Sequence, residues 1–410
     1  MTPSEIYILI KPLITMNEVS IGLSIKKDPV QAAKEAVQQA RTNLHKEKVD
    51  LGIVFASIDL SCVNLLKTIN IYLEGTPVIG CSGAAIISNQ GVFKHGLIIM
   101  LLSFSEDVYF NTACVKNIKT KTSFSAGEEL GEKLLYGFHN IPRDISVIFS
   151  DGLIEEGSNL IYGLQEKLGR SFPLAGASAS DNLTFKKTYL YFNQELISDA
   201  ACGMLLGGKL KFGLGIKHGW KPLGKPHRVT KSTGNIVYEI DGVPAVNLYE
   251  EYLACDLATL RKELKRISVL YPIGINLAGE EEYILRNILS IEDGGFLVFQ
   301  GNVPQDCPIR LMIGTKESCL SAVYQAVDEV KKTLIGYKNN FVFIFDSVSR
   351  YKLLGREANK ELEIIKEEMG NDTPIIGLYT YGEQAPLKAI NYQGRAHFHN
   401  QTITILAIGG

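Results

Sequence analysis

Polar and charged side chains stand directly after apolar segments at several places in this sequence, and the set richest in possible chemistry lies near the C-terminus. That set consists of Ser347, Ser349, Arg350, Tyr379, Tyr381 and Glu383. The guanidinium of Arg350 can hold a carboxylate through two parallel hydrogen bonds, and tyrosines nearby can wall a small apolar group. Ligands bind at strand ends in α/β sheets because loops and helix N-termini converge there. The pattern predicts a site for a small polar metabolite whose carboxylate is anchored by Arg350.

A second polar set follows an earlier apolar segment and contains Ser178, Ser180 and Asp181. We expect it to add ligand-binding groups, either at the strand ends or in a cleft between two halves of the chain. A structural alternative remains open for the C-terminal set. In that alternative Asp346 and Arg350 form an ion pair and the serines cap helices.

The common catalytic signatures GxxxxGK[ST], HExxH and GxSxG are all missing from the sequence. Cys81 follows a glycine turn but has no evident base, so it is interpreted as a small buried residue. His397 and His399 face the same side of a predicted strand without a nearby carboxylate or thiolate, so we predict no metal site. We therefore predict that the protein is not an enzyme. The remaining catalytic alternative is an unrecognised acid–base pair such as Asp151 and Glu383.

Three segments must position these residues, and all three follow one plan. Each has an apolar strand, an amphipathic helix, a strand that contains Pro-x-x-Gly, and a pair of strands close in sequence. The apolar strands lie at 49–57, 144–152 and 340–347, and the glycine turns at 77–82, 173–178 and 374–379. Consecutive apolar residues are typical of central strands covered on both faces, whereas strands close in sequence pair antiparallel. The repetition predicts an internally duplicated α/β fold of mixed, largely antiparallel sheets with covering helices.

A glycine-punctuated stretch at 211–253 interrupts the repetition between the second and third segments. Its glycines predict short strands joined by turns, followed by a helix near Pro244. We place the division between the two halves of the chain there. The predicted domains are an N-terminal lead with one helix at 1–45, a first domain at 46–245 and a second domain at 246–410.

Composition limits the class of protein. The 410 residues carry a formal net charge of −2 and 46% hydrophobic residues, so we expect a globular chain with no nucleic-acid partner. No uncharged apolar run is long enough to cross a bilayer and the start lacks a signal peptide, so we expect no membrane insertion. Seven dispersed cysteines argue against a disulfide framework and favour a cytoplasmic location.

Several motifs, in their order along the chain, resemble the FIST (F-box and intracellular signal transduction) family from about residue 45 to residue 410. In the first half they are PVIGCSG at 77–83, FSDG at 149–152, PLAGASASD at 173–181, GWKPLG at 219–224 and NIVYEIDGVPA at 235–245. In the second half they are SR at 349–350, YGE at 381–383 and HNQT at 399–402. The resemblance implies a FIST N-terminal domain followed by a FIST C-terminal domain.

Members of that family are sensory modules of signalling proteins, so the resemblance implies a sensor that binds a small ligand, with an amino acid among the candidates. It also implies that the output passes through a separate partner, such as a histidine kinase or another signalling protein. The family supplies no established catalytic residues. One departure from its pattern is Ser347-Val-Ser-Arg350, where a Cys-x-Gly-Arg motif is common. The arginine is kept, but the thiol and the glycine are not.

Some FIST proteins bind haem and respond to nitric oxide, which gives an alternative function. A haem requires an axial ligand, most simply a histidine in an apolar pocket. His218, beside Trp220, is the first candidate for that role. In the main hypothesis the protein has no cofactor.

Overall fold

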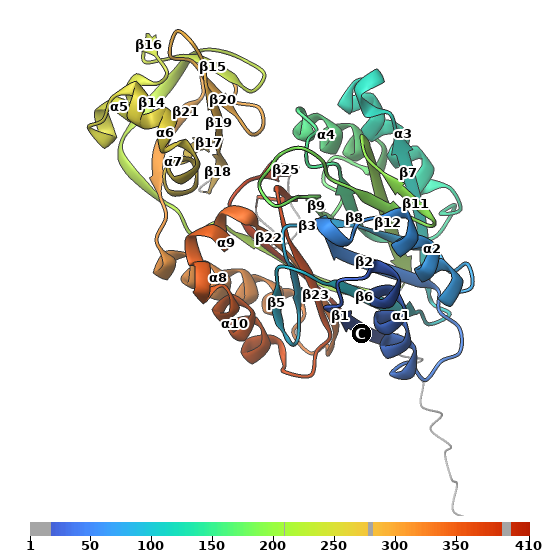
Figure 1. Ribbon diagram of the computed structural model, residues 1–410. Coiled ribbons are helices and arrows are strands. Elements are labelled where there is room, and N and C mark those ends of the chain that lie inside the picture. Colours follow the sequence, from blue (N-terminus) through green and yellow to red (C-terminus); the bar gives the residue numbers. More distant parts are fainter. Residues whose placement is uncertain (1–17, 209, 278–281, 388–394) are drawn as a thin grey trace, which may run out of the picture.

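The computed structural model describes residues 18–208, 210–277, 282–387 and 395–410. Figure 1 shows three units of sheet and helix grouped together, with a further domain projecting from one side. Each unit has a six-stranded mixed sheet, which confirms the predicted α/β class of mixed, largely antiparallel sheets with covering helices. The three repeats read from the sequence form the centres of these three units.

The first unit has the sheet order β1-β6-β2-β3-β10-β11. Its own strands are β1 Glu18–Ser24, β2 Leu51–Ser57, β3 Val78–Gly83 and β6 Leu97–Ser103. The helices that cover its outer face are α1 Pro29–Thr42 and α2 Val63–Tyr72. The Asp28 side chain caps α1 by accepting the Gln31 N–H at 2.8 Å, and Pro29 occupies the first turn, where no N–H is needed.

The second unit has the sheet order β25-β24-β9-β8-β12-β7. Its own strands are β7 Val108–Lys116, β8 Arg143–Ser150, β9 Leu174–Ser178 and β12 Ala200–Gly208. The covering helices are α3 Ser123–Leu135 and α4 Gly157–Leu168. These helices pack at close range because of two glycines. A Cβ at Gly127 would lie 2.1 Å from the Leu160 carbonyl oxygen, and one at Gly163 would lie 1.9 Å from that of Phe124.

The third unit has the sheet order β13-β26-β22-β23-β4-β5. Its own strands are β13 Lys211–Lys217, β22 Asn339–Ser347, β23 Ile375–Thr380 and β26 Ile403–Gly409. The helices are α8 Lys316–Thr333, α9 Val348–Leu354 and α10 Asn359–Met369. Two helices, α9 and α10, therefore join the parallel strands here. In none of the described ranges is a helix both long enough and apolar enough to span a membrane.

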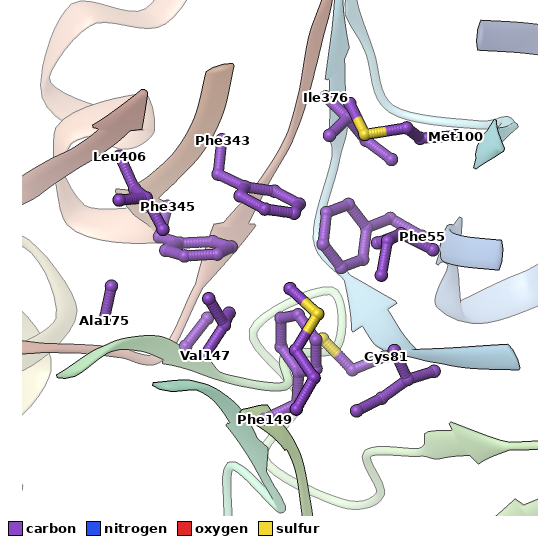
Figure 2. Packing of buried hydrophobic residues seen from close by; sticks show 14 of the residues in the cluster. Phe55, Cys81, Met100, Val147, Phe149, Ala175, Phe343, Phe345, Ile376 and Leu406 are labelled. Carbon is purple, nitrogen blue, oxygen red and sulfur yellow. The ribbon is translucent and has the colours of Figure 1, made fainter. Parts of the chain in front are cut away.

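The central strands of the three sheets contribute to two kinds of core. In β2, Ile53 and Phe55 face the centre of the molecule, whereas Val54 and Ala56 lie under the helices of their own unit. This alternation follows the two-residue period of an extended chain, and both faces are apolar because both are covered. Figure 2 shows the central core, where side chains from all three units meet.

Three phenylalanines at equivalent strand positions fill the middle of that core. The rings of Phe55, Phe149 and Phe345 meet edge to face, with centroid separations of 5.4, 5.9 and 6.4 Å (Figure 2). Edge-to-face contact is a favoured geometry for aromatic pairs. The triangle of rings marks the approximate axis that relates the three units.

Each unit also donates a hairpin to a neighbouring sheet. The hairpins are β4 Ile86–Ser88 with β5 Gly91–Phe93, β10 Leu190–Phe192 with β11 Glu195–Ile197, and β24 Gly382–Pro386 with β25 Ala396–His399. The first pairs with β23 of the third unit, the second with β3 of the first unit, and the third with β9 of the second unit. The exchange is therefore cyclic, and every sheet is completed by a different unit.

A closed ring of three main-chain hydrogen bonds lies just beyond these strands, and we call it the closure ring. Its bonds run from Ala84 N–H to Tyr379 O at 3.2 Å, from Ser180 N–H to Ser82 O at 3.0 Å, and from Tyr381 N–H to Ser178 O at 3.2 Å. Each bond joins one unit to the next. The closure ring thus repeats, at the level of single peptide groups, the cyclic exchange of the hairpins.

The inserted domain spans residues 221–313, between β13 and α8, and projects at the upper left of Figure 1. Its curled sheet follows the order β18-β17-β21-β14-β15-β20-β19, with β16 paired to β15. The strands are β14 Lys221–Thr233, β15 Ile236–Ile240, β16 Val243–Pro244, β17 Ile273–Asn276, β18 Tyr283–Arg286, β19 Ile288–Ile291, β20 Leu297–Phe299 and β21 Pro308–Ile313. The helices are α5 Asn247–Leu253, α6 Leu257–Lys262 and α7 Leu264–Leu270. The domain boundary predicted at residue 245 falls between β16 and α5.

Two neighbouring chain crossings join the inserted domain to the third unit. Gly219 in the first crossing has a φ of +89°, which favours glycine. A Cβ at Gly314 in the second crossing would lie 2.4 Å from the indole of Trp220. Trp220 in turn packs in a small apolar cluster with Met312 and Cys319. Each of the two crossings therefore contains a glycine that its surroundings require.

Candidate functional site

Arg350, the predicted carboxylate anchor, lies in α9 directly after β22 and is completely buried. Its Nε pairs with Asp346 Oδ1 at 3.0 Å and its Nη2 pairs with Glu361. The guanidinium also donates to the carbonyls of His218 at 2.6 Å and Cys319 at 3.0 Å. The structural ion pair with Asp346, which the sequence left open as an alternative, is therefore present. A ligand carboxylate could reach Arg350 only by displacing one of these partners.

The electrostatics of this cluster are those of a buried, mutually compensated group. Burial, together with the neighbouring Glu361, raises the pKa of Asp346 well above its ordinary value. Burial acts against the charge of Arg350, but Glu361 and the other groups around it outweigh this and raise the arginine's pKa. The cation therefore stays charged, and the carboxyl groups beside it neutralise it.

Ser347 and Ser349 lie where the third unit meets the inserted domain. Ser347 caps α9, and its Oγ accepts N–H groups from Ser349 at 3.4 Å and from Gln401 at 3.2 Å. The Ser349 hydroxyl accepts from the side-chain amide of Asn287, in the inserted domain, at 3.2 Å. The helix-capping role that the sequence offered as an alternative is found for Ser347.

Four predicted site residues belong to the closure ring: Ser178 and Tyr379 supply carbonyls to it, and Ser180 and Tyr381 supply N–H groups. The Ser180 hydroxyl donates to the Tyr379 carbonyl at 2.5 Å and accepts the Ala84 N–H at 2.8 Å. The hydroxyl of Ser178 lies 2.8 Å from that of Ser150. All of these residues are buried, and their main-chain hydrogen bonds join one unit to the next.

Tyr381 and Asp181 connect the third unit to the second. The Tyr381 hydroxyl donates to the Asp181 carboxylate, and the Phe185 ring stacks on Tyr381 with centroids 4.4 Å apart. The carboxylate also accepts main-chain N–H groups from its own loop, from Thr184 at 2.8 Å and Lys186 at 3.0 Å. Burial acts to raise the pKa of Asp181, but these hydrogen bonds outweigh it and lower the pKa to about 2. The ionised carboxylate shapes this loop.

Glu383 is fully buried in β24 and accepts hydrogen bonds at both oxygens. Oε1 accepts the Thr380 hydroxyl at 2.5 Å, and Oε2 accepts the N–H and hydroxyl of Thr402 at 3.2 and 2.8 Å. Burial raises the pKa of Glu383 to about 8, although these hydrogen bonds act in the opposite direction. A carboxyl group in this state changes charge readily when a cation comes close.

Seven residues form a closed circuit of contacts between the inserted domain and the third unit, which we call the junction ring. Its members are Asn287, Gln300, Ser347, Ser349, Tyr381, Asn400 and Gln401. The Tyr381 carbonyl accepts from Gln300 Nε2 at 2.5 Å and from Asn400 Nδ2 at 3.4 Å. The Gln300 N–H donates to the Asn287 carbonyl at 2.8 Å. Asn287 then leads through the two serines to Gln401, the neighbour of Asn400, and the circuit closes.

Three side-chain oxygens of the junction ring have no hydrogen-bond partner among the described residues, namely Asn287 Oδ1, Asn400 Oδ1 and Gln401 Oε1. Two of them belong to adjacent residues, Asn400 and Gln401, whose side chains are completely buried. The Asn400 Nδ2 faces the Tyr381 carbonyl, and the Gln401 Nε2 donates to the carbonyls of Ser268 and Val269 at 2.9 and 3.2 Å. A carbonyl can only accept, so the amide orientations are fixed and the two unpaired atoms are acceptors. Gln401 also has a φ of +62°, an uncommon conformation that recurs at functional sites.

The structure thus brings some of the predicted residues together and separates others. Ser347, Ser349 and Tyr381 contribute to the junction ring, and Glu383 lies next to it. Sequence reasoning missed the two junction-ring residues of the inserted domain, Asn287 and Gln300, because nothing in their spacing links them to the third unit. The HNQT motif at 399–402 was a usable signal, since it contains two of the three amides with an unpaired oxygen.

His218, the candidate haem ligand, is buried at the first chain crossing. Its Nδ1 accepts the Trp220 N–H at 2.9 Å, and its Nε2 lies 3.7 Å from the Glu282 carboxylate. The adjacent Lys217 pairs with Glu282 and Glu329 at 2.8 Å each. Burial lowers the pKa of His218 to about 4, so the ring is neutral. Charged neighbours do not fit the apolar pocket expected for a haem ligand, and the haem alternative stays a prediction.

A groove of about 810 Å³ opens elsewhere, near the N-terminal ends of β22 and β23. Its lining includes Glu18, His45, Lys46, Lys338, Asn371 and Asp372, all of them exposed or half-buried. None of the predicted site residues lines this groove. It lacks the buried, unpaired polar atoms that distinguish the junction ring.

Known proteins resemble this chain over most of its length. An uncharacterised protein of Methanocaldococcus jannaschii is 25% identical over 411 residues, which cover 91% of this chain and 76% of the relative. An uncharacterised protein of Mycobacterium tuberculosis is 20% identical over 385 residues, covering 91% and 96%. Among solved structures, the match to a cyanuric acid hydrolase covers 96% of this chain and 99% of the hydrolase chain. Its TM-score is 0.37 and the sequence identity is 7%, a likeness too weak to bear on activity.

Family models match the chain in the order that its motifs predicted. The FIST N domain matches residues 50–243, and the FIST C domain matches residues 245–386. Together they span well over half of the sequence, which confirms the resemblance. The chain belongs to the FIST family.

Proposed function

We propose that the protein is a sensor that binds a small metabolite carrying an amino group, with an amino acid as the leading candidate. The ligand would bind at the junction ring, between the inserted domain and the third unit. FIST domains are associated with signal transduction and small-ligand sensing. That association supports a binding role in preference to a catalytic one.

The two adjacent unpaired acceptors of the junction ring, on Asn400 and Gln401, are the observation that carries this proposal. A buried acceptor without a donor costs about 1–3 kcal/mol, so two from adjacent residues are an unusual expense in one place. Asn400 Oδ1 and Gln401 Oε1 would both be satisfied by a donor from outside the chain. An ammonium group has three N–H donors and no acceptor, and so matches two such oxygens.

Glu383 supports a cationic ligand group. Thr402, which donates twice to Glu383, is the residue after Gln401. With a pKa of about 8, the Glu383 carboxyl is largely protonated at neutral pH. A cation bound at the neighbouring acceptors would favour the ionised carboxylate, because opposite charges lower the pKa of an acid. Ligand binding would therefore release a proton.

The junction ring could also pass on the signal, because its members come from two domains. Asn287 and Gln300 belong to the inserted domain, and the other five belong to the third unit. A ligand that contacts both sides favours the arrangement in which they are held together. We propose that a separate partner in the cytoplasm, a histidine kinase or another signalling protein, reads this change. The seven free cysteines support that location.

The proposal is tested with ligand pairs that differ only in the amino group. Amino acids and the corresponding carboxylic acids without the α-amino group are compared for their effect on the melting temperature, Tm. We expect at least one amino acid to raise Tm and its deaminated analogue to have no effect. Equal effects, or no effect from any amino acid, would argue against the acceptor site. An intense Soret band on addition of haem would instead support the haem alternative.

A pair of substitutions at Asn400 makes the same test on the protein. Asn400→Asp keeps the size and the acceptor and adds a negative charge, although it loses the Nδ2 donor to the Tyr381 carbonyl, so an ammonium ligand should still bind. Asn400→Leu removes the acceptor and should weaken binding about tenfold or more by calorimetry. The control is Asn371→Leu, an exposed asparagine in the distant groove, which should leave affinity unchanged.

A further inference from the structure

Arg286, at the end of β18, is held in one position by three main-chain carbonyls. Its Nε donates to Asn302 O at 3.0 Å, and its Nη1 donates to Leu285 O at 2.9 Å and Phe398 O at 3.0 Å. Gly301 lies against the guanidinium, and a Cβ there would lie 3.0 Å from Nε. The side chain is 4% exposed. The group is thus buried and fixed, with one edge anchored to the third unit through Phe398.

No carboxylate of the described residues lies within ion-pair distance of Arg286. Burial lowers the pKa of Arg286 to about 10, which still leaves the group charged at neutral pH. A buried charge without a partner is costly, and proteins normally pair such groups. Within the described part of the chain, Nη2 makes no hydrogen bond, so the outer edge of the guanidinium keeps its donors.

The surroundings of Arg286 on β25 and α4 are neutral or positive. The Tyr162 hydroxyl lies 3.3 Å from His397 Nδ1, and the Arg395 guanidinium stacks over the Tyr162 ring at 5.0 Å. Burial and the charges of Arg286 and Arg395 lower the pKa of His397 to about 4. His399 is also kept neutral, by burial and by the neighbouring His397. No group that faces Arg286 from these elements supplies negative charge.

We infer that the outer, Nη2 edge of Arg286 binds an oxyanion, the carboxylate or phosphate group of a small molecule. Planar guanidinium groups match the oxygens of both anions through parallel N–H bonds. The Nη2 edge supplies such donors. If Tyr162 donates to His397 Nδ1, the Nε2 of that histidine carries a hydrogen and adds a further donor. The anion would neutralise a charge that the chain leaves unpaired.

This inference deepens the proposed function, because Arg286 adjoins Asn287 of the junction ring in sequence and Phe398 lies two residues before Asn400. It rests on the proposed function only for the identity of the natural ligand. Anion binding at Arg286 can be measured with simple ions, whether or not an amino group binds at the junction ring. The two proposals can therefore fail separately.

The test measures binding of inorganic phosphate and of acetate to the full chain at constant ionic strength. We expect one of them to raise Tm in the wild-type protein, and the comparison separates a phosphate site from a carboxylate site. Arg286→Gln should weaken that binding about 10- to 100-fold, the usual effect of losing hydrogen bonds to a charged group. Arg261→Gln, which removes an exposed arginine of the same domain, is the control for net charge and should bind as wild-type does.

A second readout keeps the test valid if Arg286→Gln folds poorly. The pKa of His397, followed by imidazole NMR in the wild-type protein, should rise when the anion binds, because a nearby negative charge favours the imidazolium. Arg286→Lys, which keeps the charge but loses the planar fork, should bind more weakly than wild-type and still shift His397. An unchanged His397 pKa at saturating anion, or equal affinity in Arg286→Gln, would overturn the inference.

Discussion

Two buried arginines of this molecule differ in whether a carboxylate balances their charge. Arg350 lies in the third unit between Asp346 and Glu361, whereas Arg286 lies in the inserted domain without a carboxylate partner among the described residues. Both also donate to main-chain carbonyls. A cation whose charge is already balanced stabilises the fold, whereas one left unbalanced gains most from a ligand. The comparison assigns a structural role to Arg350 and a binding role to Arg286. The sequence had instead predicted that Arg350 binds the ligand.

The largest effect is expected for Arg350→Met. This change leaves two carboxyl groups buried without their cation, and breaking a buried pair in this way costs about 3–5 kcal/mol. Urea unfolding at neutral pH measures the loss. Adding Asp346→Asn should recover part of it, because one of the stranded groups is then neutral. A loss of unfolding free energy below about 1 kcal/mol would mean that Arg350 does not have the structural role assigned to it.

Glu383 gives the next effect, because it lies in the field of Arg350, which acts to lower its pKa. The folded pKa of about 8 is above the ordinary 4.5, so between these values the folded state holds a proton that the unfolded state has lost. The unfolding free energy should therefore fall as pH rises through this window, by on the order of a few kcal/mol, and level off above it. In Glu383→Gln this fall should disappear. Identical pH profiles for the two proteins would show that the carboxyl group does not titrate there.

A smaller change is expected for Arg286→Met in the absence of ligand. Three hydrogen bonds to carbonyls are lost, but an uncompensated buried charge is removed, so the unfolding free energy should change by less than about 2 kcal/mol. The same urea titration measures it beside Arg350→Met. Equal losses in the two proteins would contradict the contrast between the arginines.

The smallest effect belongs to an exposed arginine with a partner. Arg261 pairs with Asp293 at 2.9 Å, and their side chains are 42% and 102% exposed. Water and salt screen such a pair, so Arg261→Gln should stay within about 0.5 kcal/mol of wild-type. A larger loss of unfolding free energy would mean that this exposed ion pair contributes more to the stability of the domain than its solvent exposure indicates.

Much of the fold could be predicted from the sequence, because local patterns specify local structure. The apolar runs around Phe55, Phe149 and Phe345, with the glycine turns after them, were enough to find three repeats. The hairpin exchange was not predictable. A hairpin such as Ile86–Phe93 can pair with any sheet edge that lies beside it. Because backbone hydrogen bonds are the same for every sequence, they do not indicate which unit supplies that edge.

The site was predicted less well, for a physical reason. Arg350 lies only four residues after Asp346, so the sequence could suggest an ion pair, but the second carboxylate, from Glu361, became visible only in the structure. Arg286 contacts Phe398, and Gln401 contacts Ser268, each across two domains. Whether a buried group has a partner depends on such distant neighbours, and the spacing of residues in one segment cannot reveal it.

The cyclic exchange of hairpins also bears on how such a molecule could arise. A chain with only one unit would carry both a sheet with an open edge and a hairpin with nothing to pair with. A closed trimer of identical chains related by a threefold axis would satisfy both needs. Fusion of three copies into one polypeptide removes the need for identity, so one copy can accept an insertion at β13 while the others keep the shared scaffold intact.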